Sequence, residues 1–428
     1  MRVHNFQLQV IEIASGRPMK AVASALLMAS VLLFTQTARA QSYAVIHSFT
    51  GQADGAYPFT GLTVDAGDTL YGTTFGGGNG GYGTVFSLDN DGSGWILSTL
   101  YSFNEGSDGA GPIARMVFGP DGSLYGSTSA GGGGPCLTSN NYHGCGTIFK
   151  LNPPPRSPAS VVYSWASTIL YRFNGTDGSY PQGDLTFDSS GTIYGTTVNG
   201  GTPGWGLVYS LTSSHGSWAE NVLYQAQNNG DGQYPWGGVV FDAAGNMYGI
   251  LEAGGLDGFG AIYKLSRSGS GWQETTLHSF SYNGDDGAYP QSGLIKDASG
   301  NMYGATAHLP GAGGSAYELT PSGGGWNYDF LDSFSGGINL GPYDKLVMDA
   351  AGNLYGTTYA DGQYGYGSVF KLTLSNGSWS YHSLHDFTGG TDGGNPICAL
   401  AFDSVGNIYG TATDGGAYNN GVVFKITP

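Results

Sequence analysis

The sequence predicts an all-β protein: a seven-bladed β-propeller with four strands in each blade, closed by an N-terminal strand that completes the last blade. Two observations lead to this prediction. A Leu-Tyr-Gly-Thr-Thr-like motif recurs seven times, at a typical spacing of about 54 residues, with no helical spacing of apolar residues between the copies. The seventh copy stops one strand short, and the segment after the N-terminal leader supplies a matching strand.

Each copy of the repeat reads as four short strands. A Gly-Leu-x-x-Asp-like run, a Gly-Asn-type turn and the Leu-Tyr-Gly-Thr-Thr run come first. A glycine-rich loop, a Val-Phe-x-Leu run and a strand ending in Leu-Tyr-Ser-Phe follow. Gly and Asn tolerate the positive φ that a tight hairpin needs, and four strands in a unit of this length suit a propeller blade. The motif tyrosines that mark the seven units are Tyr71, Tyr125, Tyr194, Tyr248, Tyr303, Tyr355 and Tyr409.

The two ends of the repeat array predict how the ring closes. Pro428 directly follows a third strand, and Ala44–Phe49 (AVIHSF) matches the fourth-strand pattern. The last blade is therefore expected to combine residues 396–428 with residues 42–49. Such an overlap hides two strand edges that would otherwise invite aggregation. We expect residues 41–428 to form this single propeller.

The N-terminal segment has the plan of a secretory signal peptide. Residues 21–34 form an apolar run of 14 residues, Lys20 precedes it, and Ala38-Arg39-Ala40 follows as a small-x-small cleavage site. The run is too short to span a membrane. We expect residues 1–40 to be removed, with Met1 or Met19 as the start. The mature protein is then secreted, extracellular or periplasmic, with no membrane insertion after cleavage.

The charge and composition of the chain argue against nucleic acid as a partner and for a folded protein. Residues 1–40 carry four basic residues and one acidic residue, so their removal changes the formal net charge from −17 to −20. Such a chain repels phosphate backbones, which argues against nucleic acid as a partner. Disordered chains have few aromatic residues, whereas this chain has 13%. The many glycines therefore indicate turns in a folded protein. We expect a monomer.

Two of the three cysteines flank a short loop. Export would allow Cys136 and Cys145 to form a disulfide. The alternative is a pair of metal ligands, but neither a Cys-x-x-Cys spacing nor a second ligand pair accompanies them. We favour the disulfide. Cys398 lies in an apolar run (ICALAF) and is expected to be a buried free thiol.

The motifs LYGTT, GG…YGTVF and F…DGxYP resemble the GloVer-type tandem repeats (the Gloeobacter/Verrucomicrobia repeat) of secreted bacterial proteins. The resemblance covers residues 43–428 and rests on seven occurrences. It implies an exported, propeller-like protein with no established activity.

Candidate functional residues are sought where the repeat fails, since a residue that recurs in every blade serves the architecture. Most first strands start with Gly or Ala, but three start with Arg115, Asp184 and Lys345, and Asp344 precedes the last of these. A charged cluster at a channel mouth is a candidate polar site, although scattered surface ion pairs would explain the same residues.

Other departures lie in the loops of the same face. Trp205 and Trp236 break the usual residue choice at their positions, and their rings suit stacking on a ligand. Glu252 interrupts blade four, where Gly-Ile-Leu-Glu replaces Gly-Thr-Thr, and His308 lies in a changed loop of blade five (HLPGAGG). We take Arg115, Lys345, Trp205, Trp236 and His308 as ligand-binding candidates.

Catalytic and metal signatures are weak. No G-x-S-x-G or H-E-x-x-H motif occurs, so Glu252, Asp184 and Asp344 are the only catalytic candidates. The recurring Asp-Gly-x-x-Pro loops suggest turn chemistry more than calcium, which wants six to eight ligands. No cofactor is indicated.

The residues therefore favour a secreted binding or scaffolding propeller. Its ligand would be an extracellular carbohydrate or cell-surface polymer on the face that carries the glycine-rich and Asp-Gly-x-x-Pro loops, here called the upper face. One alternative is an extracellular hydrolase or lyase acting at the channel mouth, and another is a purely structural envelope protein.

Overall fold

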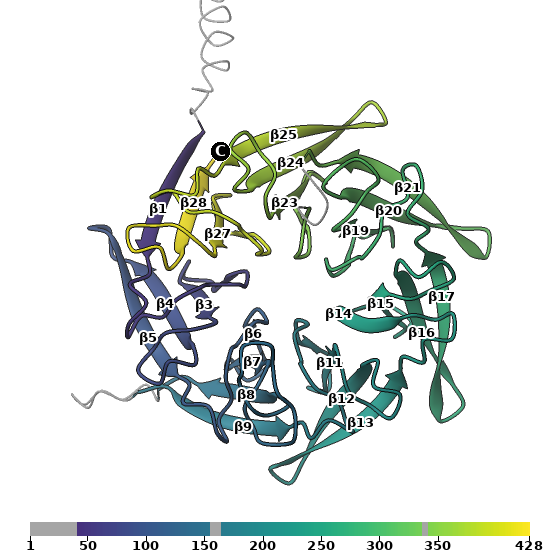
Figure 1. The fold of residues 1–428 in the computed structure, drawn as a ribbon, viewed down its shortest axis with the longest axis horizontal. Helices are drawn as coiled ribbons and strands as arrows, with labels where there is room; N and C mark the ends of the chain where they lie inside the picture. The colour runs from purple at the N-terminus through teal and green to yellow at the C-terminus, as the bar shows by residue number, and fades with distance from the viewer. Residues whose placement is uncertain (1–40, 155–163, 336–340) are drawn as a thin grey trace, which may run out of the picture. The chain divides into compact units, whose positions relative to one another are not determined.

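The computed structural model describes residues 41–154, 164–335 and 341–428, so the predicted signal peptide lies outside the described residues. Seven four-stranded antiparallel sheets follow one another around a ring, which confirms the predicted fold class (Figure 1). In the described part of the chain, no helix has the length and apolar character needed to cross a membrane.

The first strand of each blade is the innermost and the shortest. Six of these strands have only two residues, and one has nine. They are β2 (Thr63–Val64), β6 (Val117–Phe118), β10 (Thr186–Phe187), β14 (Gln233–Phe241), β18 (Ile295–Lys296), β22 (Val347–Met348) and β26 (Ala401–Phe402).

The second strands carry the Leu-Tyr-Gly-Thr-Thr motif and are almost completely buried. An added Cβ at Gly72 would lie 2.6 Å from Phe86 Cζ, so glycine at this position lets the aromatic ring of the next strand pack against the backbone. The second strands are β3 (Leu70–Thr74), β7 (Leu124–Thr128), β11 (Ile193–Thr197), β15 (Met247–Ala253), β19 (Met302–Thr306), β23 (Leu354–Thr358) and β27 (Ile408–Ala412).

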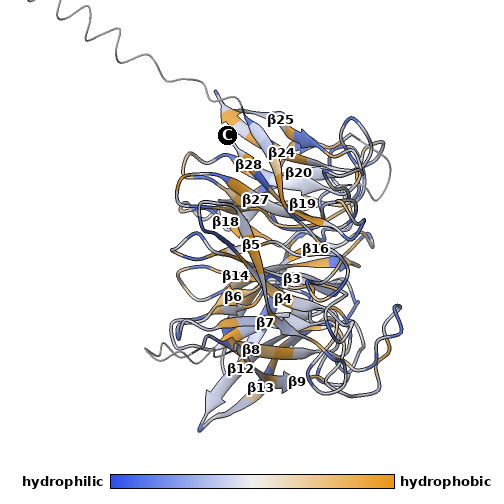
Figure 2. Ribbon diagram, turned by 90° about the vertical axis from the view of Figure 1, so that its left-hand side faces the viewer, coloured by the Kyte–Doolittle hydropathy of each residue, from blue (hydrophilic) through white to orange (hydrophobic). Residues whose placement is uncertain are grey.

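The third and fourth strands form the outer part of each blade. The third strands are β4 (Thr84–Asn90), β8 (Thr147–Asn152), β12 (Leu207–Ser214), β16 (Ala261–Ser268), β20 (Ser315–Ser322), β24 (Ser368–Ser375) and β28 (Val422–Thr427). The fourth strands are β5 (Trp95–Ser102), β9 (Ala166–Arg172), β13 (Ser217–Gln225), β17 (Gly271–Ser279), β21 (Gly325–Ser333), β25 (Ser378–Asp386) and β1 (Ser42–Ser48). The apolar residues lie mainly along the strands (Figure 2).

The core consists of clusters that join neighbouring blades rather than one central core. Between the last and the first blade, for example, Phe49, Leu62 and Phe86 pack with Tyr409 and Val423. Burying apolar surface between neighbours is what allows a chain of this length to fold without one large core.

The ring closes as the sequence predicts. β1 pairs antiparallel with β28, with Ser42 opposite Thr427 and Ser48 opposite Val422. The N-terminal strand therefore completes the sheet whose other three strands are β28, β27 and β26.

The aspartates of the Asp-Gly-x-x-Pro loops anchor those loops to the preceding fourth strand. Six of them contact a His or Tyr side chain at one equivalent strand position. The pairs are His47–Asp54, Tyr101–Asp108, Tyr171–Asp177, Tyr224–Asp231, His278–Asp286 and His385–Asp392. The remaining connection, from β21 to β22, lacks the Asp-Gly pair, and Asp332 occupies the equivalent position of β21. This pairing explains why His alternates only with Tyr in the other six.

Candidate functional site

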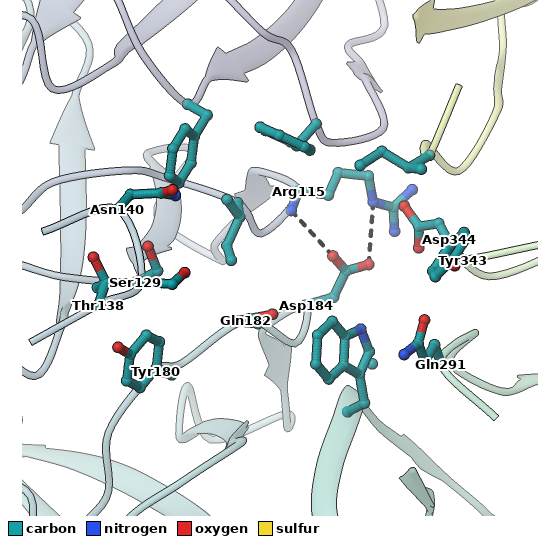
Figure 3. A pocket seen from close by; sticks show the side chains of 17 residues that line it. Arg115, Ser129, Thr138, Asn140, Tyr180, Gln182, Asp184, Gln291, Tyr343 and Asp344 are labelled. Carbon is teal, nitrogen blue, oxygen red and sulfur yellow. Dashed lines mark hydrogen bonds and ion pairs between the residues drawn. The ribbon is translucent and has the colours of Figure 1, made fainter. Parts of the chain in front are cut away.

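A cavity of about 320 Å³ opens on the upper face, and every blade contributes to its wall (Figure 3). The residue that follows the loop proline lines it in all seven blades. These residues are Phe59, Ile113, Gln182, Trp236, Gln291, Tyr343 and Ile397. Because all seven blades meet only near the axis of the ring, this cavity lies at the mouth of the central channel.

The backbone before each proline directs this ring of residues inward. In five blades a residue other than glycine has φ between 53° and 62° there: Tyr57, Tyr180, Tyr234, Tyr289 and Asn395. Such a conformation is costly for residues with a Cβ, so surrounding contacts must hold it. The backbone N–H of Tyr234, for example, donates to the carbonyl of Trp205 at 2.8 Å, and that of Tyr289 donates to the carbonyl of Phe259 at 2.8 Å.

Three charged residues from different blades converge at the floor of this cavity. Asp184 Oδ2 lies 3.3 Å from Arg115 Nε and also contacts Lys345 Nζ. Asp184 Oδ1 accepts a hydrogen bond of 3.2 Å from the backbone N–H of Arg115. Burial alone would raise the pKa of Asp184, but the charges of Lys345 and Arg115 outweigh it and lower that pKa. The carboxylate is therefore ionised and shared by two cations.

A second carboxyl group, that of Asp344, lines the same cavity. Its two oxygens accept hydrogen bonds from the backbone N–H groups of Lys345, at 2.7 Å, and Ala399, at 2.6 Å. Burial and the negative charge of Asp184 raise the pKa of Asp344. Two carboxyl groups in one cavity thus have pKa values moved in opposite directions.

The first strand that carries Trp236, β14, is longer than the other first strands and contains a bulge. Trp236 pairs with Ile250 and Val240 pairs with Tyr248, so the residues between them bulge out of the strand. Gly238 in this bulge has φ of 78°, and an added Cβ would lie 2.5 Å from the carbonyl oxygen of Asp184. Only glycine fits this close approach, which joins the bulge to the charged floor.

Glu252 lies behind the wall of the cavity rather than in it. Gln291, which lines the cavity, donates a hydrogen bond from Nε2 to the Glu252 carboxylate. Burial raises the pKa of Glu252. Glu252 therefore contacts a side chain of the cavity wall, Gln291, without lining the cavity itself.

The disulfide predicted between Cys136 and Cys145 is present, and the loop that it closes forms part of the cavity wall. Thr138, Ser139 and Asn140 of this loop line the cavity. The ring of Tyr142 stacks on Phe75, with centroids 5.5 Å apart. Cys398 is a buried free thiol, as predicted.

The family model of the Gloeobacter/Verrucomicrobia repeat matches residues 14–165, 136–312 and 307–428. The chain belongs to the Gloeobacter/Verrucomicrobia repeat family. A comparison with curated protein sequences finds no match.

Solved structures with a similar arrangement share little sequence with this member of the Gloeobacter/Verrucomicrobia repeat family. A protein of unknown function from Dyadobacter fermentans is 13% identical with a TM-score of 0.46, covering 79% of this chain and 96% of its own. A putative glucose dehydrogenase from Thermus thermophilus is 15% identical with a TM-score of 0.43, covering 74% and 96%. A polysaccharide lyase described as an ulvan lyase is 11% identical with a TM-score of 0.48, covering 87% and 94%. These values carry no inference about the ligand.

Within this Gloeobacter/Verrucomicrobia repeat array, the predicted site residues fall into two groups. Arg115, Asp184, Asp344 and Trp236 line the cavity, and Lys345 contacts it through Asp184. The remaining ligand candidates lie outside that lining. The ring of Trp205 packs edge-on against Tyr234, with centroids 5.8 Å apart, and His308 packs against Tyr289, at 4.8 Å.

Sequence reasoning missed most of the post-proline ring, including Gln182, Gln291 and Tyr343. A signal was available. The loop aspartate and the proline recur almost without change, whereas the position directly after the proline holds Phe, Ile, Gln, Trp or Tyr in different repeats. A position that varies inside an otherwise constant motif is not required by the fold of the repeat, so it is a candidate for a functional role.

The loop carboxylates are occupied by the loops themselves. Asp286 accepts hydrogen bonds from Ser281 N, at 2.9 Å, and Ser281 Oγ, at 2.7 Å, in addition to its contact with His278. Within residues 41–154, 164–335 and 341–428, no three His, Cys, Asp or Glu side chains gather closely enough to hold a metal ion.

Proposed function

We propose that this protein is a secreted binding propeller that holds a carbohydrate in the cavity at the mouth of its central channel. The observation that carries the proposal is the post-proline ring, where seven equivalent backbone positions aim different side chains at one space. Aromatic faces from Phe59, Trp236 and Tyr343 stand beside the side-chain amides of Gln182 and Gln291. Rings for stacking and amides for hydroxyl groups are the combination that a sugar requires.

Export of the protein is part of this proposal. The signal-peptide pattern of residues 1–40 and a disulfide between Cys136 and Cys145 both favour an oxidising compartment. In that compartment, the polymers of the cell surface and its surroundings are the available carbohydrates.

The test is a glycan array followed by calorimetric titration of the best ligand against two matched variants. Trp236→Ala removes a ring from the cavity wall, whereas Trp205→Ala removes a ring that packs outside it. We expect Trp236→Ala to weaken binding by at least about tenfold, or 1.4 kcal/mol. We expect Trp205→Ala to change it by less than about twofold. An array without hits, or equal losses in both variants, would contradict the proposal.

A hydrolase or lyase acting in the same cavity is a second candidate, favoured by the opposite pKa shifts of Asp184 and Asp344. Acid–base catalysis by two carboxyl groups uses a pair whose surroundings move their pKa values apart. This candidate predicts that a bound oligosaccharide is shortened over hours and that Asp344→Asn abolishes the cleavage while retaining binding. Chromatography that recovers the oligosaccharide intact would exclude it.

A further inference from the structure

Arg115 has more hydrogen-bonding capacity than the protein uses. Its Nε lies 3.3 Å from Asp184 Oδ2 but is buried and makes no hydrogen bond there. Among the described residues, no hydrogen bond or ion pair engages its two terminal amino groups. The buried Nε is therefore unsatisfied, whereas the two terminal amino groups retain access to solvent and are available to a ligand.

The charge of Arg115 is also not fully balanced. Asp184 is already paired with Lys345, which is not part of the cavity lining and therefore serves the floor beneath it. Asp344 directs both carboxyl oxygens at backbone N–H groups, and burial together with Asp184 raises its pKa toward the neutral form. Among the described residues, Arg115 thus shares Asp184, its one ion-pair partner, with Lys345.

The cavity on the upper face is the side from which an anion would reach Arg115. Arg115 also borders a second cavity, of about 420 Å³, whose other walls are the inner strands, with Leu62, Val64, Met116 and Val347 among them. That cavity offers an anion mainly apolar walls. On the upper side, the guanidinium lies beside Asp184 and near Asp344 and Tyr343, within the space that Gln182 and Gln291 also line (Figure 3).

We propose that the carbohydrate bound in this cavity is an acidic sugar, whose carboxylate or sulfate group is held by the terminal amino groups of Arg115. The inference rests on the proposed function and names the substrate class. A guanidinium presents a planar fork of donors that matches a carboxylate or a sulfate edge. The formal net charge, −17 for the full chain and −20 without residues 1–40, repels long polyanions, so a single acidic residue or a short oligosaccharide is the fitting ligand.

The experiment compares sugars that differ only at one carbon. Glucose, glucuronate and glucose 6-sulfate, and the corresponding galactose series, are titrated against the protein by ligand-observed NMR. Acetate serves as a carboxylate without a sugar. We expect at least one acidic sugar to bind about tenfold more tightly than its neutral partner, the effect of about one charge-assisted contact. The glucuronate and sulfate arms distinguish the two sources of negative charge.

Variants of the floor give effects of opposite sign. Arg115→Met is expected to remove the preference for the acidic sugar, so that the acidic and the neutral sugar bind within about twofold of each other. Arg115→Lys keeps the charge without the fork and should retain part of the preference. Asp184→Asn removes the competing carboxylate and should strengthen binding of the acidic sugar. Arg267→Met is the matched control, because Arg267 stacks on Trp272, with its guanidinium carbon 4.1 Å from the ring centroid, and does not line this cavity.

The outcomes separate this inference from the proposed function. Neutral sugars that bind as well as acidic ones, with binding lost in Trp236→Ala, would overturn the acidic ligand and leave the carbohydrate site standing. Acetate binding as tightly as glucuronate would overturn the role of the sugar. Absence of binding by every sugar would overturn both proposals. Circular dichroism and a thermal melt verify that each variant is folded, and Arg115→Lys keeps the test valid if Arg115→Met does not fold.

Discussion

Two positions of the repeat lie five residues apart and follow opposite rules. The loop aspartate recurs and always has the same kind of partner, while the residue after the proline differs from blade to blade. The pairs are Asp54 and Phe59, Asp108 and Ile113, Asp177 and Gln182, Asp231 and Trp236, Asp286 and Gln291, and Asp392 and Ile397.

The difference follows from what each position contacts. The aspartate binds a His or Tyr of the neighbouring fourth strand together with backbone N–H groups of its own loop, a requirement that each blade meets separately. The post-proline side chain points at the axis, where the wall belongs to all blades and no single blade requires a given residue. The loop aspartate is therefore constant because it anchors its own loop, whereas the post-proline residue varies because it lines a cavity shared by all blades.

Removing one anchor should cause the largest loss of stability. Asp231 is buried and accepts hydrogen bonds from Tyr224 Oη and from the backbone N–H groups of Gln227, Asn229 and Gly232. Asp231→Ala leaves several of these donors without an acceptor, which we expect to cost about 3–5 kcal/mol of unfolding free energy. Urea denaturation measures this loss.

The control for this variant is Asp257→Ala, in an exposed stretch of a glycine-rich loop. A surface change of this kind should alter the stability by less than about 0.5 kcal/mol. Equal effects of the two variants would mean that the loop aspartates are not anchors.

Alanine variants of two glycines with the same backbone conformation distinguish the cost of a positive φ from the cost of a steric clash. Gly238 and Gly245 have φ of 78° and 80°, but only at Gly238 does an added Cβ meet another atom, 2.5 Å away on the Asp184 backbone. Gly245→Ala should cost about 1 kcal/mol for the left-handed conformation alone. Gly238→Ala should cost about 3 kcal/mol, because a forced backbone shift is added.

The Gly238→Ala variant also connects the two regions of the comparison. Displacing the bulge moves Trp236 and Asp184 together, so we expect ligand binding in the central cavity to weaken along with stability. Calorimetric titration of the two alanine variants measures this. A Gly238→Ala protein that melts and binds like Gly245→Ala would show that the bulge is not held by its contact with Asp184.

The architecture could be predicted from the sequence because it is periodic. The strand order of each blade follows from the repeat, and the closure by β1 follows from counting strands at the ends. The convergence of Arg115, Asp184 and Lys345 could be anticipated because a position at the start of a first strand lies near the axis in every blade.

The remainder of the cavity depends on features that spacing does not encode. No count of residues indicates that β14 bulges after Trp236, or that Gly238 lies against the Asp184 backbone. The direction of the disulfide loop is equally hidden, since two cysteines predict a closed loop but not that Asn140 lines the channel mouth. Glu252 was recognised as a departure, but its link to the cavity through Gln291 required the fold.

A second carboxyl group beside an anchor should reduce stability at neutral pH. Tyr171 Oη donates to Asp177 at 2.7 Å and to Glu220 at 3.4 Å. Burial and the charge of Asp177 raise the pKa of Glu220 to about 7. A carboxyl group with a raised pKa in the folded state favours folding at acid pH and loses that contribution as pH rises through the folded value.

Glu220→Gln should therefore stabilise the protein by about 1 kcal/mol at pH 8, a value reduced for the partial exposure of this side chain. The gain should shrink as the pH falls from 7 toward 5, because Glu220 becomes neutral in the folded protein. Thermal melts at both pH values measure it. A gain that is the same at pH 8 and pH 5 would assign the effect to packing instead of charge.

The smallest expected effect tests whether His and Tyr are interchangeable partners of the loop aspartate. Burial lowers the pKa of His47 and His385 below the usual 6.5, although Asp54 and Asp392 oppose this shift. The folded state thus favours neutral imidazoles, and their contribution to stability is present above pH 6.5 and lost as the pH falls below it. Hydrogen bonds from Thr50 and His47 outweigh burial and lower the pKa of Asp54. The contribution of the Asp54 carboxylate to protein stability is therefore lost only as the pH falls below about 4.

Replacing both histidines with the residue that other blades use isolates this contribution. In the double variant His47→Tyr and His385→Tyr, each hydroxyl should reach its aspartate as Tyr101 reaches Asp108, at 2.8 Å. The decrease in melting temperature between pH 7 and pH 5 should become smaller than in the parent protein, while the value at pH 7 changes little. If the decrease stays the same, other groups titrate in that range, and the choice between His and Tyr at the anchor has no consequence for stability.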